Sequence, residues 1–286
     1  MTREQLTAEF EEQRPHLRAV AYRMLGSVSE ADDAVQEAWP RVTRADTSEV
    51  ENMRAWLTTV VARVSLDMLR SRRSKREEPF GAHVPEPVVS DHDGSHPEHE
   101  ALLADSVGLA LLVVLETLNP AERLAYVLHD MFAVPFDDIA PIVERSPAAT
   151  RQLASRARRR VDAEATVPDP DLDRQREVVE AFMAASREGD FEGLVAVLHP
   201  DVVLRADIAR GVSRQVRGAE AVAEQARMYR ERERFSRPVL VNGAAGILVA
   251  SEEQTYAVLG MTVADGKIVA IDILADPERL ERLALP

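Results

Sequence analysis

The chain has 286 residues, which at roughly 150 residues per domain predicts two or more domains. Hydrophobic residues make up 45% of it and charged residues 29%, and this balance excludes wholesale disorder. The chain has no cysteine, which excludes disulfides and thiolate sites, and its net charge of −14 argues against a protein that coats nucleic acid over its whole surface. Because the amino terminus is charged and no apolar run approaches the roughly 20 residues of a membrane span, we expect a cytoplasmic protein without membrane contact.

The first predicted domain covers residues 1–76, and its apolar pattern is helical throughout. Within the stretch 54–70, one face carries apolar side chains at helical spacing, namely Leu57, Val60, Val61, Val64 and Met68. The opposite face carries Arg63, Asp67 and Arg70. The preceding helix is predicted to begin at Ser29 as its N-cap, with acids in the first turn that suit the helix dipole. We therefore predict an all-helical bundle.

The end of this domain is strongly basic. Residues 63–76 contain a single acid and six basic side chains, namely Arg63, Arg70, Arg72, Arg73, Lys75 and Arg76. Such a run is either a solvated helix face or a surface that binds nucleic acid. A second basic helix further along the chain favours nucleic-acid binding.

Residues 77–105 are predicted to be an acidic linker rich in proline and histidine. The segment holds four prolines, four histidines and eight acids, and it contains no lysine or arginine. The spacing of His92, His96 and His99 could ligate a metal. Because no cysteine is near and the surroundings are rich in proline and acid, we expect a solvated linker without a metal.

The second predicted domain, residues 106–165, consists of short helices with tight connections, which indicates a helix-turn-helix unit. Its last helix begins at Ser146 as N-cap, with Pro147 at the first helical position. Residues at intervals of four pack inward in this helix, namely Ala149, Leu153, Ala157 and Val161. The outward residues are then Arg151, Gln152, Ser155, Arg156, Arg158 and Arg159. A helix of this kind can enter a major groove and contact base edges and phosphates, so we expect it to bind DNA.

Residues 170–286 are predicted to form an α+β domain with helices packed on a curved antiparallel sheet. An amphipathic helix is expected from Leu172 to Arg187, ending at Gly189. Asn242-Gly243 and Asp265-Gly266 each lie between β-rich runs and predict hairpins.

Several polar residues of this domain are candidates for acid–base catalysis in an apolar pocket: His199, Asp201, Asp207, Tyr256 and Asp272. His199 and Asp201 fit a helix-to-strand corner instead, and Asp272 alternates with Ile271 and Ile273 as in a strand. We therefore expect no enzymatic activity, and we leave open a pocket that binds a small ligand.

Three segments resemble one known family: EADDAVQEAW at 30–39, WLTTVVARVSLDMLRSRRSKRE at 56–77 and SPAATRQLASRARRRV at 146–161. They resemble the extracytoplasmic-function (ECF) sigma factors of bacterial RNA polymerase, and the carboxy-terminal part resembles a SnoaL-like domain of the nuclear-transport-factor fold. Two short motifs fit the sigma subgroup with this fused extension: Val84-Pro85-Glu86-Pro87, and Asp276-Pro277-Glu278-Arg279-Leu280. The resemblance implies two all-α sigma domains, a helical bundle and a helix-turn-helix, followed by an α+β domain.

The resemblance also implies partners and site residues. Promoter DNA would contact Arg63, Arg70, Arg72 and Arg73 as well as the outward residues of the last helix, while core RNA polymerase would contact Asp32, Asp33, Gln36 and Glu37. Regulation would come from the chain's own extension through Pro85, Glu86, Pro87, Asp276, Pro277 and Leu280. No separate anti-sigma factor and no cofactor would be required.

Two departures from the family pattern affect these expectations. Pro40 and Pro141 stand where the family keeps a helix former, so either helix is expected to be shorter or bent. The glycine-rich loop of the subgroup is replaced by Asp207-Ile208-Ala209-Arg210-Gly211.

Two alternatives to a promoter-specificity subunit remain at this stage. One is a DNA-binding repressor whose last domain senses a metabolite, which would have no need of the acidic helix. The other is a SnoaL-like enzyme fused to a DNA-binding module, which would lose turnover on Asp207→Asn.

Overall fold

The computed structural model describes residues 2–48, 50–75, 84–91, 108–209, 212–228 and 235–286. The chain divides into two compact units. The helical unit comprises Met1–Glu77 and Val114–Glu164, and the sheet unit comprises Glu78–Val113 and Ala165–Pro286. Within the described part of the chain, no helix is long and apolar enough to cross a bilayer.

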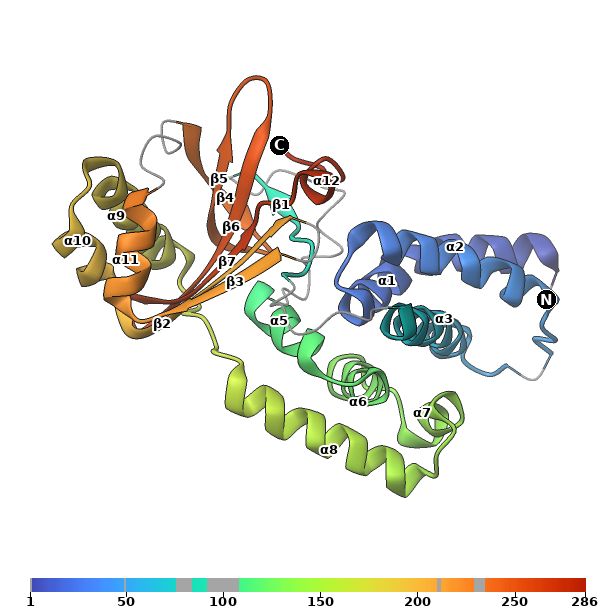
Figure 1. Cartoon of the computed structure of the whole chain (residues 1–286). Coiled ribbons are helices and arrows are strands. Elements are labelled where there is room, and N and C mark those ends of the chain that lie inside the picture. Colours follow the sequence, from blue (N-terminus) through green and yellow to red (C-terminus); the bar gives the residue numbers. More distant parts are fainter. Residues whose placement is uncertain (1, 49, 76–83, 92–107, 210–211, 229–234) are drawn as a thin grey trace. The chain divides into compact units, whose positions relative to one another are not determined.

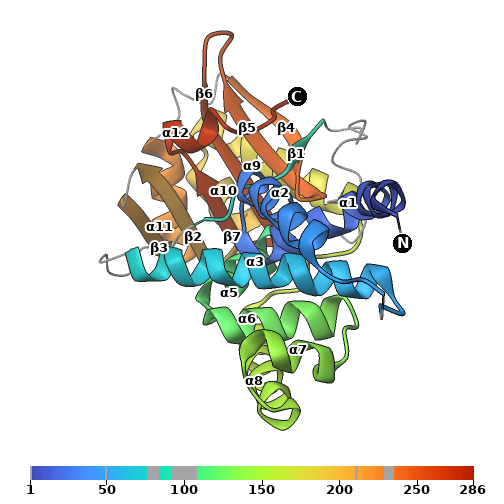
Figure 2. The same cartoon turned by 90° about the vertical axis from the view of Figure 1, so that its right-hand side faces the viewer.

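The first half of the helical unit is a bundle of three helices, as predicted. Its helices are α1 (Arg3–Leu25), α2 (Val28–Arg44) and α3 (Met53–Lys75), and Figure 2 shows α3 as one long, uninterrupted helix. On α3, the apolar face is buried at Leu57, Val61 and Val64, while Arg63 and Arg70 are exposed. The amphipathic pattern therefore predicted the packing of this helix correctly.

The predicted start of α2 was wrong by two residues. Ser27, not Ser29, is the N-cap, and its hydroxyl accepts a hydrogen bond from the Glu30 amide at 3.2 Å. Gly26 ends α1 in the left-handed conformation at φ 69°, so the chain turns sharply there and places Ser27 at the cap. Pro40 lies within α2, and the helix continues four residues beyond it to Arg44.

The second half of the helical unit contains short helices and one long one, and the first of them begins within the segment Glu78–Val113 of the sheet unit. They are α5 (Leu109–Thr117), α6 (Pro120–Tyr126), a π-helical turn η1 (Val127–Met131), α7 (Phe136–Val143) and α8 (Pro147–Glu164). Ser146 caps α8 as predicted, because its hydroxyl accepts from the Ala149 amide at 3.2 Å. Pro141 lies within α7, which ends two residues later at Val143.

A buried arginine joins the two halves of the helical unit. Arg123 of α6 is 2% exposed, and its Nε donates to the Arg23 carbonyl of α1 at 3.1 Å. Its charge is paired with Glu116, with 2.9 Å between Nη1 and Oε1. His16 and Phe132 add an edge-to-face aromatic contact with 5.3 Å between ring centroids. The two halves are therefore tied by specific polar groups as well as by apolar packing.

The sheet unit carries three helices on one face of a curved sheet (Figure 1). These helices are α9 (Leu172–Glu188), α10 (Phe191–Val197) and α11 (Ala219–Met228), and a short α12 (Pro277–Leu280) follows the last strand. The strands are β1 (Val89–Ser90), β2 (Leu198–Ala209), β3 (Val212–Arg217), β4 (Ser236–Val241), β5 (Ala244–Ala250), β6 (Thr255–Ala264) and β7 (Lys267–Leu274). Their order in the sheet is β1-β4-β5-β6-β7-β2-β3.

The two predicted hairpins are present. Asn242 and Gly243 have φ of 50° and 78° between β4 and β5, and Asp265 and Gly266 have φ of 52° and 70° between β6 and β7. Two consecutive positive φ values are the signature of the tight turns that match strand twist. The sheet was predicted to be antiparallel, and its neighbouring strands pair in this way except β2 and β7, which pair in parallel.

One strand comes from the segment predicted to be a linker. Residues 84–90 are buried, and β1 pairs antiparallel with β4 through Val89–Val241 and Ser90–Leu240. The side-chain amide oxygen of Asn242 also accepts from the Val88 amide at 3.1 Å. A two-residue strand whose partner lies about 150 residues away has no local periodicity, so the sequence pattern did not reveal it.

Candidate nucleic-acid interface

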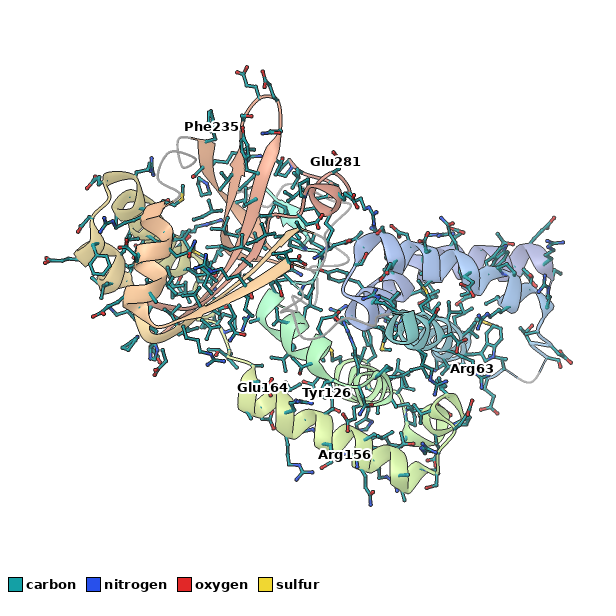
Figure 3. All side chains as sticks on the ribbon, viewed as in Figure 1. Arg63, Tyr126, Arg156, Glu164, Phe235 and Glu281 are labelled. Atoms are coloured by element: carbon teal, nitrogen blue, oxygen red, sulfur yellow. The ribbon has the colours of Figure 1, made fainter. Side chains whose placement is uncertain are left out.

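Helix α8 presents the arginine face that the sequence predicted. Leu153, Ala157 and Val161 are buried, and the outward side chains are exposed, namely Arg151, Gln152, Ser155, Arg156, Arg158 and Arg159. Figure 3 marks Arg156 on this helix. Because 18 residues rise about 27 Å, the helix is long enough to lie in a major groove.

Two of these arginines are paired with acids on neighbouring helices. Arg156 Nε lies 2.9 Å from Glu122 Oε1, and Arg158 Nε lies 2.8 Å from Asp130 Oδ1. Hydrogen bonding to Asp130 raises the pKa of Arg158, so this side chain stays charged. Both guanidinium groups remain about half exposed. Such surface pairs are weak, so they hold the arginines in place without removing them from solvent.

Arg151 is held in a different way. Its guanidinium lies over the ring of Phe136, with 5.7 Å from Cζ to the centroid. A cation–π contact at the surface orients an arginine and leaves its five N–H donors available to a ligand. Arg151 lies in the amino-terminal part of α8, the part that contacts base edges when such a helix enters the major groove.

The basic face of α3 divides into two kinds of arginine. Arg63 and Arg70 are exposed, and Figure 3 marks Arg63. Arg72 instead donates to the Leu25 carbonyl at 3.3 Å and pairs with Glu30, so its guanidinium ties α3 to the α1–α2 turn. Arg73 belongs to α3, but its side chain lies outside the described residues.

The acidic residues predicted for a protein partner share one helix. On α2, Asp33, Gln36 and Glu37 are exposed, and Asp32 is half-exposed with its carboxylate 2.6 Å from Arg18 Nε. Ala34, Val35 and Ala38 form the buried face of the same helix. The structure therefore brings the four predicted residues together on the solvent side of α2.

The two motifs of the predicted regulatory contact meet in the sheet unit, and Arg279 joins them. Its Nη1 lies 2.5 Å from Asp207 Oδ2 on β2, and its Nη2 donates to the Val84 carbonyl at 2.7 Å. Asp276 caps α12 by accepting from the Arg279 amide at 3.1 Å. We call these four residues, Val84, Asp207, Asp276 and Arg279, the linker clamp.

The other predicted regulatory residues surround this clamp. Pro85, Glu86 and Pro87 are buried beside Val84, with Glu86 6% exposed. Leu280 is buried, whereas Pro277 is exposed at the start of α12. Asp207, which sequence reasoning considered as a catalytic base, is a structural partner of Arg279 instead.

The remaining catalytic candidates do not form an acid–base pair. Asp272 is 1% exposed and binds Arg205 through two hydrogen bonds of 2.6 and 3.1 Å. Burial raises the pKa of Asp272 above its ordinary value, and the Arg205 guanidinium offsets part of that rise. His199 accepts from the Asp201 amide at 3.1 Å, as a chain corner requires. Tyr256 alone among them lines the cavity of the sheet unit.

Sequence reasoning missed three arginines with structural roles, Arg123, Arg205 and Arg279. Arg205 carried a weak signal, since it stands in a strand with alternating apolar residues and Asp272 stands in another. Parallel pairing of β2 with β7 sets Arg205 opposite Asp272, and no local pattern predicts that register.

Comparison with known proteins gives two family matches and full-length relatives. The sigma-70 region 2 family matches residues 10–75, and the sigma-70 region 4 family matches residues 108–161. The chain is 41% identical to the ECF RNA polymerase sigma factor SigJ of Mycobacterium tuberculosis, over 95% of this chain and 92% of that protein. It is 32% identical to the probable ECF RNA polymerase sigma factor SigI of the same species, over 97% and 96% of the two chains. The crystal structure of SigJ matches with a TM-score of 0.78 at 37% identity and covers 98% of this chain and 100% of that one.

Proposed function

Because the chain belongs to the extracytoplasmic-function (ECF) sigma factors of RNA polymerase, we propose that its sheet unit regulates transcription initiation by holding the segment between the two sigma domains. The predicted family, fold class and main function are confirmed: two helical sigma domains precede an α+β domain, in a protein that directs promoter-specific initiation. The regulatory step and the residues that perform each role are our proposals.

The linker clamp is the observation that carries the regulatory proposal. Two kinds of contact fix the segment 84–90 to the sheet: the β1–β4 strand pairing and the bond from Arg279 to Val84. The same sheet also receives the start of α5, where Leu109 Cδ2 lies close to the backbone of Gly260. The connection between the two sigma domains is thus attached near both of its ends to one rigid sheet.

Holding this connection restricts how far the two sigma domains can separate. In the helical unit the two domains are joined through Arg123 and Arg23, whereas a sigma factor on a promoter reads two separate DNA elements. A clamp that favours the joined arrangement lowers the population of the separated one, and its release raises that population. In this proposal the regulator belongs to the chain itself, no separate anti-sigma factor is required, and the protein acts in the cytoplasm beside its polymerase.

We assign the DNA contacts to the exposed arginine faces. Arg63, Arg70, Arg72 and Arg73 would act on the minus-ten element, and Arg151, Gln152, Ser155, Arg156, Arg158 and Arg159 would act on the minus-thirty-five element. Exposure of Arg63, Arg70 and the α8 residues supports this assignment, while the contacts of Arg72 with Leu25 and Glu30 give it a positioning role. The exposed acids on α2, with Gln36, would bind a basic surface of core polymerase.

Transcription in vitro tests the clamp. With full-length protein, core polymerase and a linear promoter fragment, we expect Arg279→Ala to raise the yield of promoter-dependent transcript several-fold, because the linker segment loses its side-chain anchor. Asp207→Asn should act in the same direction, since it removes the carboxylate that orients Arg279. Arg282→Ala is the matched control, because Arg282 is an exposed arginine three residues further along.

Two results would contradict the proposal. Transcript that is unchanged or reduced in Arg279→Ala, while far-UV circular dichroism and core-polymerase binding stay as in the wild type, would show that the clamp does not restrain initiation. An increase of equal size in Arg282→Ala would show a general charge effect.

A further inference from the structure

The helix-covered face of the sheet unit encloses a cavity that neither the linker clamp nor the sigma domains use. Its volume is about 170 Å³, and its walls come from α9, α11 and strands β2 to β7. Most of the lining side chains are apolar, such as Phe182, Leu204, Ile247 and Ile271. A cavity of roughly 150 Å³ lined by apolar groups is large enough to hold a benzene ring. The space therefore fits a one-ring compound or a short alkyl chain.

A buried polar side chain without a partner points to a ligand in this cavity. Gln225 of α11 lines the cavity and is 8% exposed, and no residue in the described part of the chain forms a hydrogen bond with its amide. The amide therefore faces the cavity with its hydrogen-bonding groups open to a ligand. A bound molecule with a polar head group would supply the missing partner.

The charge of the lining identifies the head group. Among the described residues that line the cavity, Arg214 is charged and the others are neutral, so no aspartate, glutamate, histidine or lysine is among them. Arg214 lies on β3, is exposed to solvent, and has no acidic partner in the described ranges. A cation at the rim of an apolar cavity attracts an anion and disfavours a cation.

The rim also exposes apolar side chains. Ile208 lines the cavity and is 38% exposed, and Phe235 is 47% exposed and stacks on Tyr256 with 6.4 Å between ring centroids. Figure 3 marks Phe235 at the edge of the sheet unit. Exposed apolar side chains therefore lie beside two residues of the lining, Ile208 itself and Tyr256.

We propose that this cavity binds a small apolar monocarboxylate, with its ring or chain against Phe182, Leu204 and Ile247 and its carboxylate toward Arg214 and Gln225. A guanidinium pairs with a carboxylate through two parallel hydrogen bonds, and the Gln225 amide donates a further one. The described lining contains no carboxylate or imidazole, so a carboxylate ligand meets no like charge there.

Isothermal titration calorimetry on the full-length chain tests the proposal with benzoate and octanoate as probes. We expect saturable binding of one molecule per chain, with a Kd of about 1 mM or below for a ligand of this size. Benzyl alcohol, the neutral counterpart of similar shape, should bind several-fold more weakly, and benzylamine should show no binding.

Variants locate the site and separate charge from shape. Arg214→Gln should weaken benzoate binding about tenfold and leave benzyl alcohol unchanged, whereas Arg217→Gln, on the same strand but outside the lining, should have no effect. Gln225→Leu should weaken benzoate and leave the fold intact, because the amide has no protein partner. Ala257→Phe should abolish binding of both the acid and the alcohol by filling the cavity.

Four outcomes would overturn the inference. The first three are the absence of saturable binding by both acids, an equal affinity for benzoate in the wild type and Arg214→Gln, and an equal loss in Arg217→Gln. Benzyl alcohol binding as tightly as benzoate would exclude the carboxylate class.

Discussion

The arginines of α8 and the arginines of the sheet unit have opposite surroundings. Arg156 and Arg158 are about half exposed, although the acids they meet, Glu122 and Asp130, are only 13% and 17% exposed. Arg205 and Arg279 are 20% and 14% exposed, and they bind Asp272 and Asp207, which are almost fully buried. The guanidinium groups of Arg156 and Arg158 already reach solvent and can turn toward a phosphate, whereas Arg205 and Arg279 cannot leave their acids without leaving a charge in the protein interior. The exposure of the guanidinium, more than that of its acid, therefore distinguishes an arginine that can bind a ligand from a structural one.

The largest expected effect comes from breaking the buried pair. Arg205→Leu leaves the Asp272 carboxylate buried and unpaired, which should lower the free energy of unfolding by about 3–5 kcal/mol. Asp272→Asn should cost less, about 1–3 kcal/mol, because it leaves no buried charge and Arg205 can reach solvent. Denaturant unfolding, with hydrogen exchange of the β2 and β7 amides to report on the sheet unit, measures both. An equal loss of unfolding free energy in Arg205→Leu and Asp272→Asn would show that a buried, unpaired charge is not what makes this pair structural.

The same variant has a predicted pH dependence. Burial raises the pKa of Asp272 in the folded chain above its unfolded value, so the folded state binds more protons and stability falls as pH rises through that interval. Arg205→Leu removes the guanidinium that holds the pKa of Asp272 down. The folded-state pKa of Asp272 should therefore rise further, and the pH range over which stability falls should extend upward. The destabilisation by Arg205→Leu should therefore be smaller at pH 5 than at pH 8. A difference that does not change with pH would show that Asp272 does not take up a proton.

The next effect concerns promoter binding by α8. Arg151→Ala and Arg158→Ala should each weaken promoter binding of the polymerase holoenzyme by about 1–3 kcal/mol if they contact base edges, and Arg151→Ala should also relax sequence preference. Electrophoretic mobility shifts with matched and mutated minus-thirty-five elements measure this. Arg227→Ala serves as the control, since Arg227 is an exposed arginine of the sheet unit, paired with Glu224 in the same way. A comparable loss of promoter affinity in Arg227→Ala would show that the arginines of α8 are no more important for DNA binding than an exposed arginine of the sheet unit.

The smallest effect should come from the acid partner of an α8 arginine. Glu122→Gln removes the charge that faces Arg156, and because Arg156 is half exposed and the glutamine amide can still accept its hydrogen bond, the stability change should stay within about 0.2–1 kcal/mol. The affinity for promoter DNA should rise slightly, because Arg156 no longer has to break an ion pair with Glu122 before it binds a phosphate. Unfolding midpoints and the same mobility shifts test this, and a loss of several kcal/mol would place Arg156 among the structural arginines.

Local patterns predicted most of the fold. Helical spacing predicted the buried face of α3, Ser146 and Pro147 marked the start of α8, and Asn242-Gly243 and Asp265-Gly266 marked two hairpins. Each of these features depends on residues that are near one another in the chain. The prediction failed where the partner was remote, as for β1, which lies within the proline-rich segment. One failure was local: the turn at Gly26 places the α2 cap at Ser27 instead of Ser29.

The candidate sites show the same division. Exposure of Arg63 and Arg151 followed from periodicity, because a helix fixes which side chains point outward once its buried face is known. The sequence did not show which of the arginines, on helix faces or in strands, already have a partner within the protein. Arg72 meets Leu25, and Arg279 meets Asp207 and Val84, through contacts between residues that are 47 to 195 positions apart.

The sequence alone determined the family, the order of the domains, the helices with their arginine faces, and the hairpin turns, since all of these are written in neighbouring residues and in the spacing of apolar side chains. Only the tertiary structure decided the attachment of the segment 84–90 to the sheet, the pairing of buried arginines with buried acids, and the cavity beside Gln225. These depend on strand register and on packing between distant segments, where the free energy comes from groups that the chain brings together only when it is folded.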